Sequence, residues 1–98
     1  MGEPATSRAG GGPVHQRADD VFAAALHDQT LLLHATTGRY HGLNPVGARI
    51  WELLAEPMAE AALVQRLVAE FEVTEEECER EVSAFLSLLR DRGLLAAG

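Results

Sequence analysis

Few side chains in this chain of 98 residues could carry out covalent chemistry, and its one thiol, Cys78, is the first candidate. A nucleophilic Cys needs a neighbouring base and an electropositive setting that favours the thiolate. Cys78 instead lies in the acidic run Glu75-Glu76-Glu77-Cys78-Glu79-Arg80-Glu81, whose negative charges disfavour a thiolate. The sequence therefore predicts a structural Cys78 that is buried on the apolar face of a helix.

The remaining groups that could do chemistry do not form a site either. The four imidazoles are His15, His27, His34 and His41. Their spacing matches no closed zinc site, although two of them fall on predicted hairpin strands. The glycine run Gly10-Gly11-Gly12 has no strand before it and no helix after it, so it is not a phosphate-binding loop. We therefore expect no catalytic residue, no metal and no cofactor.

Charge and composition narrow the possible partners and the compartment. The formal net charge is -7, which argues against a nucleic-acid partner because phosphates would be repelled. A single Cys cannot form an internal disulfide, so we expect a cytoplasmic protein. The apolar runs fall well short of the ~20 residues that span a bilayer, so no membrane partner is expected.

The chain divides into a tail and one domain. Residues 1–18 are rich in Gly and Pro and contain few large apolar side chains, so they have little to bury. We predict a disordered N-terminal tail over residues 1–18 and a single folded domain over residues 19–98.

The first half of the domain predicts three strands joined by short turns. They cover Val21–Leu26, Thr30–Ala35 and Arg39–Leu43. The turns are His27-Asp28-Gln29 and Thr36-Thr37-Gly38, in which Gly38 supplies a positive φ. Connections this short imply antiparallel neighbours, with the second strand in the centre and the first and third at the edges.

The second half predicts three helices. Asn44 is a suitable N-cap for the first, with Pro45 at its first position. The second spans residues 59–71, and Thr74 with Glu77 forms a capping box at the start of the third. Gly93 is a candidate C-terminal cap of that helix. The fold class is therefore α+β: a winged helix-turn-helix with a three-stranded antiparallel sheet followed by three helices.

The third strand is an edge without the usual protection. Soluble proteins defend edge strands with Lys, Pro or bulges, whereas this strand has only a terminal Arg. Such an edge can accept an extended peptide as a fourth strand, and the last helix could supply the wall of an apolar groove. The expected peptide-binding residues are Arg39, Tyr40, His41, Gly42 and Leu43 on the strand, and Cys78, Val82, Phe85, Leu86 and Leu89 on the helix. Periodicity alone leaves open whether those five helix residues are all core.

The segment from Thr37 to Leu54, TGRYHGLNPVGARIWELL, resembles the PqqD-like family of peptide-recognition modules. The resemblance continues through Phe71-Glu72-Val73, the acidic start of the last helix and Gly93-Leu94-Leu95, and so covers the domain from Val21 to Leu95. The sequence around Asn44, Leu43-Asn44-Pro45-Val46-Gly47-Ala48, is most similar to that of the free-standing leader-binding proteins of lasso-peptide biosynthesis. His41 departs from the family, which often has an aromatic or apolar residue there.

The resemblance implies a RiPP recognition element, that is, a non-enzymatic binder of the leader of a ribosomally made precursor peptide. The leader would join the third strand, with its apolar residues in a groove against the last helix, and would be presented to a separate leader peptidase. The resemblance leaves open a second role, a peptide chaperone for a radical-SAM or other modifying enzyme. We expect a monomer or a weak dimer.

A DNA-binding winged-helix regulator and an enzyme are the two alternative classes of function. A DNA-binding winged helix would insert its third helix into the major groove and needs basic residues there. Residues 75–81 instead hold five acids and one Arg. An enzyme would need a constellation of catalytic residues, and the sequence has none that we recognise.

Overall fold

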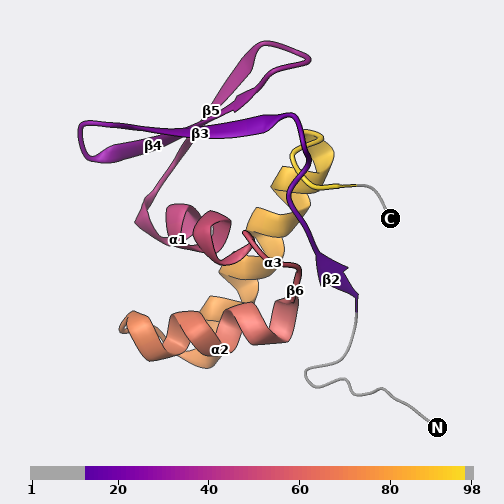
Figure 1. Cartoon of the computed structure of the whole chain (residues 1–98). Coiled ribbons are helices and arrows are strands. Elements are labelled where there is room, and N and C mark those ends of the chain that lie inside the picture. Colours follow the sequence, from indigo (N-terminus) through magenta and orange to yellow (C-terminus); the bar gives the residue numbers. More distant parts are fainter. Residues whose placement is uncertain (1–12, 97–98) are drawn as a thin grey trace, which may run out of the picture.

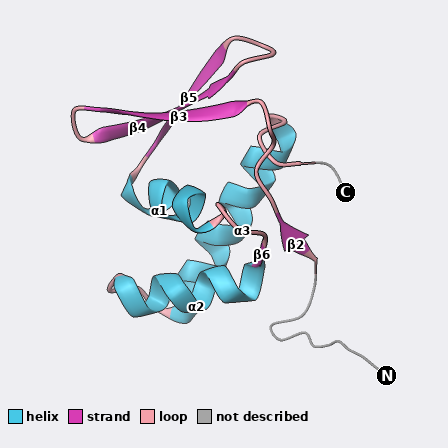
Figure 2. Cartoon of the chain, viewed as in Figure 1, coloured by secondary structure: helices cyan, strands magenta, loops and turns pink. Residues whose placement is uncertain are grey.

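A three-stranded antiparallel sheet lies on one side of the molecule and three helices lie on the other (Figure 1). The structure is a computed structural model and describes residues 13–96. The sheet has the order β3-β4-β5, formed by β3 (Val21–Leu26), β4 (Gln29–His34) and β5 (Arg39–Leu43). The helices are α1 (Pro45–Leu53), α2 (Glu60–Glu70) and α3 (Glu75–Asp91). Figure 2 shows this segregation of sheet and helices, which confirms the predicted α+β class.

The register of the sheet gives it one buried face and one exposed face. Leu32 of β4 pairs with Ala23 and His41, and it is completely buried against the helices. The next row, one residue along, is Phe22, Leu33 and Tyr40. It points the other way, because successive side chains of a strand alternate. The central strand is therefore β4, as predicted, and the outer face presents aromatic side chains to solvent.

The first turn is tighter than predicted. Leu26 pairs directly with Gln29, so only His27 and Asp28 connect β3 to β4. His27 adopts φ 59°, a conformation that two-residue hairpin turns require and that non-glycine residues seldom take. Gly38, at φ 74°, has the predicted positive φ in the second turn.

The helix ends follow the predicted caps. The amide of Gly47 donates to Asn44 Oδ1 at 2.7 Å, and the amide of Glu77 donates to Thr74 Oγ1 at 3.1 Å. Each bond satisfies an amide that has no partner within its own helix. Gly93, at φ 73°, follows α3 and allows the chain to reverse.

The core lies between the inner face of the sheet and the three helices. Its buried apolar residues come from every helix and from β4 and β5: Leu32, Leu43, Ile50, Trp51, Leu53, Leu54, Leu63, Val64, Leu67, Cys78, Val82, Leu86, Leu89 and Leu94. Four of them lie along one face of α3, which packs mainly against α2, whereas α1 contacts α2 and the strands β4 and β5.

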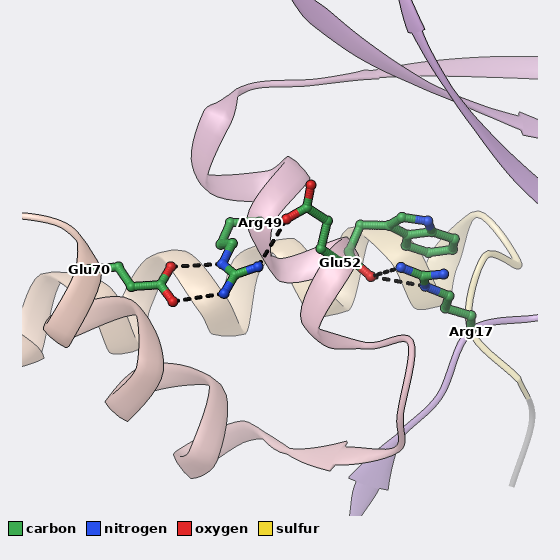
Figure 3. A network of polar contacts seen from close by, with 5 residues as sticks. Arg17, Arg49, Glu52 and Glu70 are labelled. Atoms are coloured by element: carbon green, nitrogen blue, oxygen red, sulfur yellow. Dashed lines mark hydrogen bonds and ion pairs between the residues drawn. The ribbon is translucent and has the colours of Figure 1, made fainter.

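A bidentate ion pair holds α1 against the end of α2 (Figure 3). Arg49 donates from Nε and a terminal nitrogen to the two carboxylate oxygens of Glu70, at 2.7 and 2.9 Å. Its other terminal nitrogen donates to Glu52 at 3.0 Å. These hydrogen bonds lower the pKa of Glu70 and raise that of Arg49. The positive charge of Arg49, one of eight Arg residues in the chain, is therefore neutralised by carboxylates of the same chain.

The predicted boundary of the N-terminal tail is wrong for its last five residues. Strand β2 (Val14–His15) pairs with β6 (Met58–Ala59), the segment just before α2. Further along, the amide of Ala18 donates to the carbonyl of Leu94 at 3.0 Å. Backbone pairing explains the difference, because it needs no apolar side chains. Residues 1–12 of the predicted tail lie outside the described residues.

Arg17 connects the segment before β3 to the end of α1 through contacts with Trp51 (Figure 3). Its guanidinium donates two hydrogen bonds to the carbonyl of Trp51, one of them at 2.9 Å from Nε. The same guanidinium lies over the indole ring of Trp51, 4.8 Å from the ring centroid. Burial lowers the pKa of Arg17, but an Arg stays charged in proteins, so both contacts are those of a cation.

We expect Arg17→Ala to lower the free energy of unfolding by about 1 kcal/mol, because it removes a charge-assisted hydrogen bond and a cation–π contact. Urea denaturation followed by circular dichroism measures the loss. Arg66→Ala is the matched control, since Arg66 is exposed and forms no ion pair with the described residues, and it should change stability by less than about 0.5 kcal/mol. Equal losses in the two variants would contradict a structural role for Arg17.

Candidate peptide-binding site

The free edge of the sheet is β5, as predicted. Within residues 13–96 its outer edge pairs with no other strand. The strand contains neither Lys nor Pro, so its unpaired backbone groups are open to another extended chain. A glycine in a strand can let another backbone approach closely, but Gly42 leaves no such space. The position of an added Cβ would lie 2.8 Å from Nε2 of Gln29 on β4.

Most of the helix residues predicted to bind a peptide belong to the core. Cys78, Val82, Leu86 and Leu89 are at most 3% exposed and form one stripe of α3 that faces the other helices and the sheet. Their side chains are therefore not available to a ligand, and that part of the predicted site is wrong. Phe85 is the exception, since it is half-buried and lies beside this stripe.

A second stripe of α3 lines a groove against α1. The groove has a volume of about 430 Å³. Its walls are Glu81, Ala84, Phe85 and Leu88 from α3, and Asn44, Val46, Gly47 and Ile50 from the start of α1. Leu88 is 40% exposed, which is unusual for a Leu in a domain whose other helix leucines are buried. The groove is thus mostly apolar and begins where β5 ends.

Phe85 forms the floor of the groove through a close contact with α1. A Cβ added to Gly47 would lie 3.1 Å from one ring carbon of Phe85 and 3.3 Å from Asn44 Oδ1. Glycine at this position therefore lets the aromatic ring rest on the first turn of α1. A larger residue would push the ring outward and narrow the groove.

The other end of the same face is basic. Arg92, the C-cap residue of α3, lies eleven residues after Glu81 and donates to Nδ1 of His41 on β5 at 3.1 Å. Nδ1 must accept this bond, because a guanidinium has no acceptor, so the imidazole is neutral there. Burial lowers the pKa of His41, and the nearby Arg92, Arg39 and His34 lower it further. The bond joins the middle of the edge strand to the end of α3.

The remaining predicted strand residues fall into three environments. The side chain of Tyr40 is 68% exposed on the outer face of the sheet, away from the groove. Leu43 is 6% exposed and belongs to the core, so it can offer a ligand only its backbone. Arg39 is exposed and shares the inner face with His41. Because these side chains lie in different environments, the part of β5 that can act as one binding element is its backbone.

Sequence reasoning missed Val46, Glu81, Ala84 and Leu88 as groove residues. A signal for the helix part was present, since Glu81, Phe85, Leu88 and Arg92 repeat at i, i+4, i+7 and i+11, the spacing of one helical face. The more apolar neighbouring stripe concealed it. No signal in the sequence indicates that Val46 on α1 would lie opposite α3.

Cys78 is buried, as predicted. Its thiol donates to the carbonyl of Val64 at 3.8 Å. Burial raises the pKa of the thiol, and the charges of Glu81, Glu79 and Glu75 raise it further. Both effects keep the sulfur in the weakly nucleophilic thiol form.

We expect the native protein to react with Ellman's reagent at pH 8 at least about 100-fold more slowly than the protein unfolded in guanidinium chloride, because only opened molecules expose the thiolate. Arg17→Ala should speed the native reaction about fivefold, because a loss of about 1 kcal/mol raises the population of opened molecules by about that factor. Immediate reaction of the native chain would show that Cys78 is accessible.

The rest of the described structure offers no competing site next to β5. No cluster of three or more His, Cys, Asp and Glu side chains in residues 13–96 is arranged to hold a metal ion. In the same part of the chain no helix has the length and apolar character needed to cross a membrane. A larger hollow of about 1030 Å³ lies against α2 and the opposite side of α3. None of its lining residues comes from β5 or α1, and several are charged: Glu60, Glu79, Arg80 and Arg90.

Comparisons with known proteins agree with this geometry. A model of the family described as coenzyme PQQ synthesis protein D (PqqD) matches residues 29–95. A structure of TbiB1 in complex with the TbiA(beta) leader peptide is similar with a TM-score of 0.76 and 37% identity, over 85% of this chain and 96% of that one. A lasso peptide synthetase B1 complexed with the leader peptide is similar with a TM-score of 0.75 and 25% identity, over 85% and 98% of the two chains. A search of curated proteins finds no match. The chain belongs to the PqqD family.

Proposed function

We propose that this chain binds the leader region of a ribosomally synthesised precursor peptide as a fourth antiparallel strand on β5. The observation that carries the proposal is an unprotected edge strand directly beside an apolar groove. Two similar structures, TbiB1 and a lasso peptide synthetase B1, are complexes with leader peptides, which supports the same ligand class here.

The edge of β5 and the groove between α1 and α3 have different roles in recognition. Main-chain hydrogen bonds to β5 supply affinity that depends little on sequence. The groove supplies specificity, because apolar leader side chains would leave water and contact Phe85, Val46 and Leu88. The edge is already formed in the free chain, so most of the entropic cost of binding comes from ordering the leader.

We further propose that the chain has no catalytic activity of its own and presents the bound leader to a separate enzyme in the cytoplasm, such as a leader peptidase of a lasso-peptide pathway. The buried, acid-flanked Cys78 supports this, because it is the only thiol and is poorly suited to act as a nucleophile. A leader on β5 would occupy the strand edge through which a second copy could pair, so the complex should be monomeric in this chain.

We expect binding to show the hydrogen-bond pattern of strand addition. The ligands are the TbiA(beta) leader peptide and any short peptide whose reading frame is found beside this gene, each N-methylated at one backbone position at a time. In an antiparallel pair, alternate residues of a strand point their amides at the neighbour. Methylation at every second position should therefore weaken binding about tenfold or more, and the intervening positions should tolerate it.

Isothermal titration calorimetry measures each affinity, and the unmethylated peptide with a scrambled sequence is the control. A flat response to methylation would contradict strand addition. The absence of binding by all of these peptides would contradict the proposed function itself. Because only the ligand is altered, neither result can arise from unfolding of the protein.

A further inference from the structure

The candidate site, which is β5 together with the groove beside it, carries charges of both signs. Glu81 lines the groove together with the first residues of α1. Arg92, eleven residues later at the C-terminal cap of α3, lies outside the groove and contacts His41 of β5. Arg39, the first residue of β5, projects from the same inner face as His41. An acidic chain with net charge -7 thus places two cations on one end of its candidate site.

These charges are not neutralised within residues 13–96. The ion pairs there join His34 to Asp20 and Arg49 to both Glu52 and Glu70. None of them involves Glu81, Arg39 or Arg92. The contact of Arg92 is with a neutral imidazole nitrogen, which leaves its positive charge uncompensated. All three charges are therefore available to a ligand.

The direction of β5 determines which end of the ligand meets which charge. β5 runs from Arg39 to Leu43 and continues into α1, beside Glu81. A strand added antiparallel to β5 starts near Leu43 and ends near Arg39. Its N-terminal part would face Glu81, and its C-terminal part would face Arg39 and Arg92.

The length of α3 between the charges sets their spacing on the ligand. Eleven residues of helix at 1.5 Å per residue span about 16 Å, which an extended strand covers in about five residues. Resting on the proposed function, we propose that the leader carries a basic residue followed, about five residues later, by an acidic residue, with apolar side chains between them. The charge pattern sets the register of the leader, whereas the groove alone would tolerate slippage by two residues.

This register predicts the outcome of an unbiased selection. Random 16-residue peptides displayed on phage are selected on the full chain, on Arg39→Glu/Arg92→Glu and on the control Arg66→Glu/Arg80→Glu. Both double variants change the net charge equally, but Arg66 lies on α2 and Arg80 lines the hollow on the opposite side of α3. Circular dichroism checks that each variant is folded, and Arg39→Glu alone replaces the first pair if removal of the Arg92 contact unfolds it.

We expect the wild-type chain and the control to enrich peptides with Lys or Arg before the apolar residues and Asp or Glu after them. The Arg39→Glu/Arg92→Glu chain should instead enrich Lys or Arg at the later position. For a selected peptide, exchanging its two charged residues should weaken binding to the wild-type chain about tenfold in low salt, and less in 0.5 M NaCl.

Enrichment of apolar peptides without this charge order, or the same enrichment on both double variants, would overturn the charge register and leave the proposed function standing. Enrichment of the opposite order would show that the ligand runs the other way along β5. That result would also overturn the proposal. Failure of the wild-type chain to enrich any peptide would overturn the register together with the proposed function.

Discussion

Leu88→Glu is expected to weaken leader binding about 100-fold while leaving the fold intact. Leu88 is 40% exposed in the free chain, so a charge there remains hydrated until a ligand covers it. Binding would then have to desolvate the carboxylate against apolar leader side chains, in a groove that already contains Glu81. A penalty of about 2.7 kcal/mol corresponds to 100-fold in the dissociation constant. Calorimetric titration with the leader peptide measures it.

Ser87→Glu is the matched control for this variant. Ser87 is the adjacent residue of α3, is exposed and lines the hollow on the opposite side of the helix. The new residue and the change in net charge are the same, and we expect the affinity to change less than threefold. Thermal unfolding should be similar for both variants. Equal weakening by Ser87→Glu and Leu88→Glu would mean that net charge, and not the groove, determines binding.

Leu86→Ala is expected to have the opposite profile, a large loss of stability with little change in the affinity of the folded protein. Leu86 is 1% exposed in the core stripe of α3. Truncating a buried Leu removes apolar contacts and leaves a cavity, which costs about 3 kcal/mol. That is a large fraction of the ~4–12 kcal/mol expected for a domain of this size. Urea denaturation measures the loss.

The leader itself helps to separate the two effects. A saturating ligand that binds only the folded state stabilises it, so the Leu86→Ala protein should be titrated at a temperature at which it is mostly folded. There its affinity should lie within threefold of the wild type. A 100-fold weaker affinity with unchanged stability would place Leu86 in the binding surface, against its burial in the structure.

The local features of the fold were predictable because they depend on short-range chemistry. Asn44 and Thr74 cap their helices through contacts three residues away, and Gly93 ends α3 through its own φ. The edge position of β5 followed from short connections alone. The division of α3 into a core stripe and a groove stripe was not predictable, because Phe85 and Leu86 are adjacent and equally apolar. Only the position of α1 decides which of them is covered.

Long-range backbone contacts explain the other error. Val14 and His15 pair with residues more than forty positions away, and nothing in either two-residue segment is typical of a strand. Arg17 makes its contacts across 34 positions with a carbonyl group, which every residue possesses. Such contacts depend on the finished fold, and a tail rich in Gly and Pro gives no sign of them.

The stacking of Arg17 on Trp51 also has an optical consequence. Trp51 is the only tryptophan of the chain, is 3% exposed and is not among the residues that line the groove. Its fluorescence therefore depends on whether the guanidinium stays over the ring, 4.8 Å from the centroid, and hence on the docking of the segment before β3. Emission from this single fluorophore reports detachment of the N-terminal segment, and a fluorophore on the peptide is needed to follow a ligand in the groove.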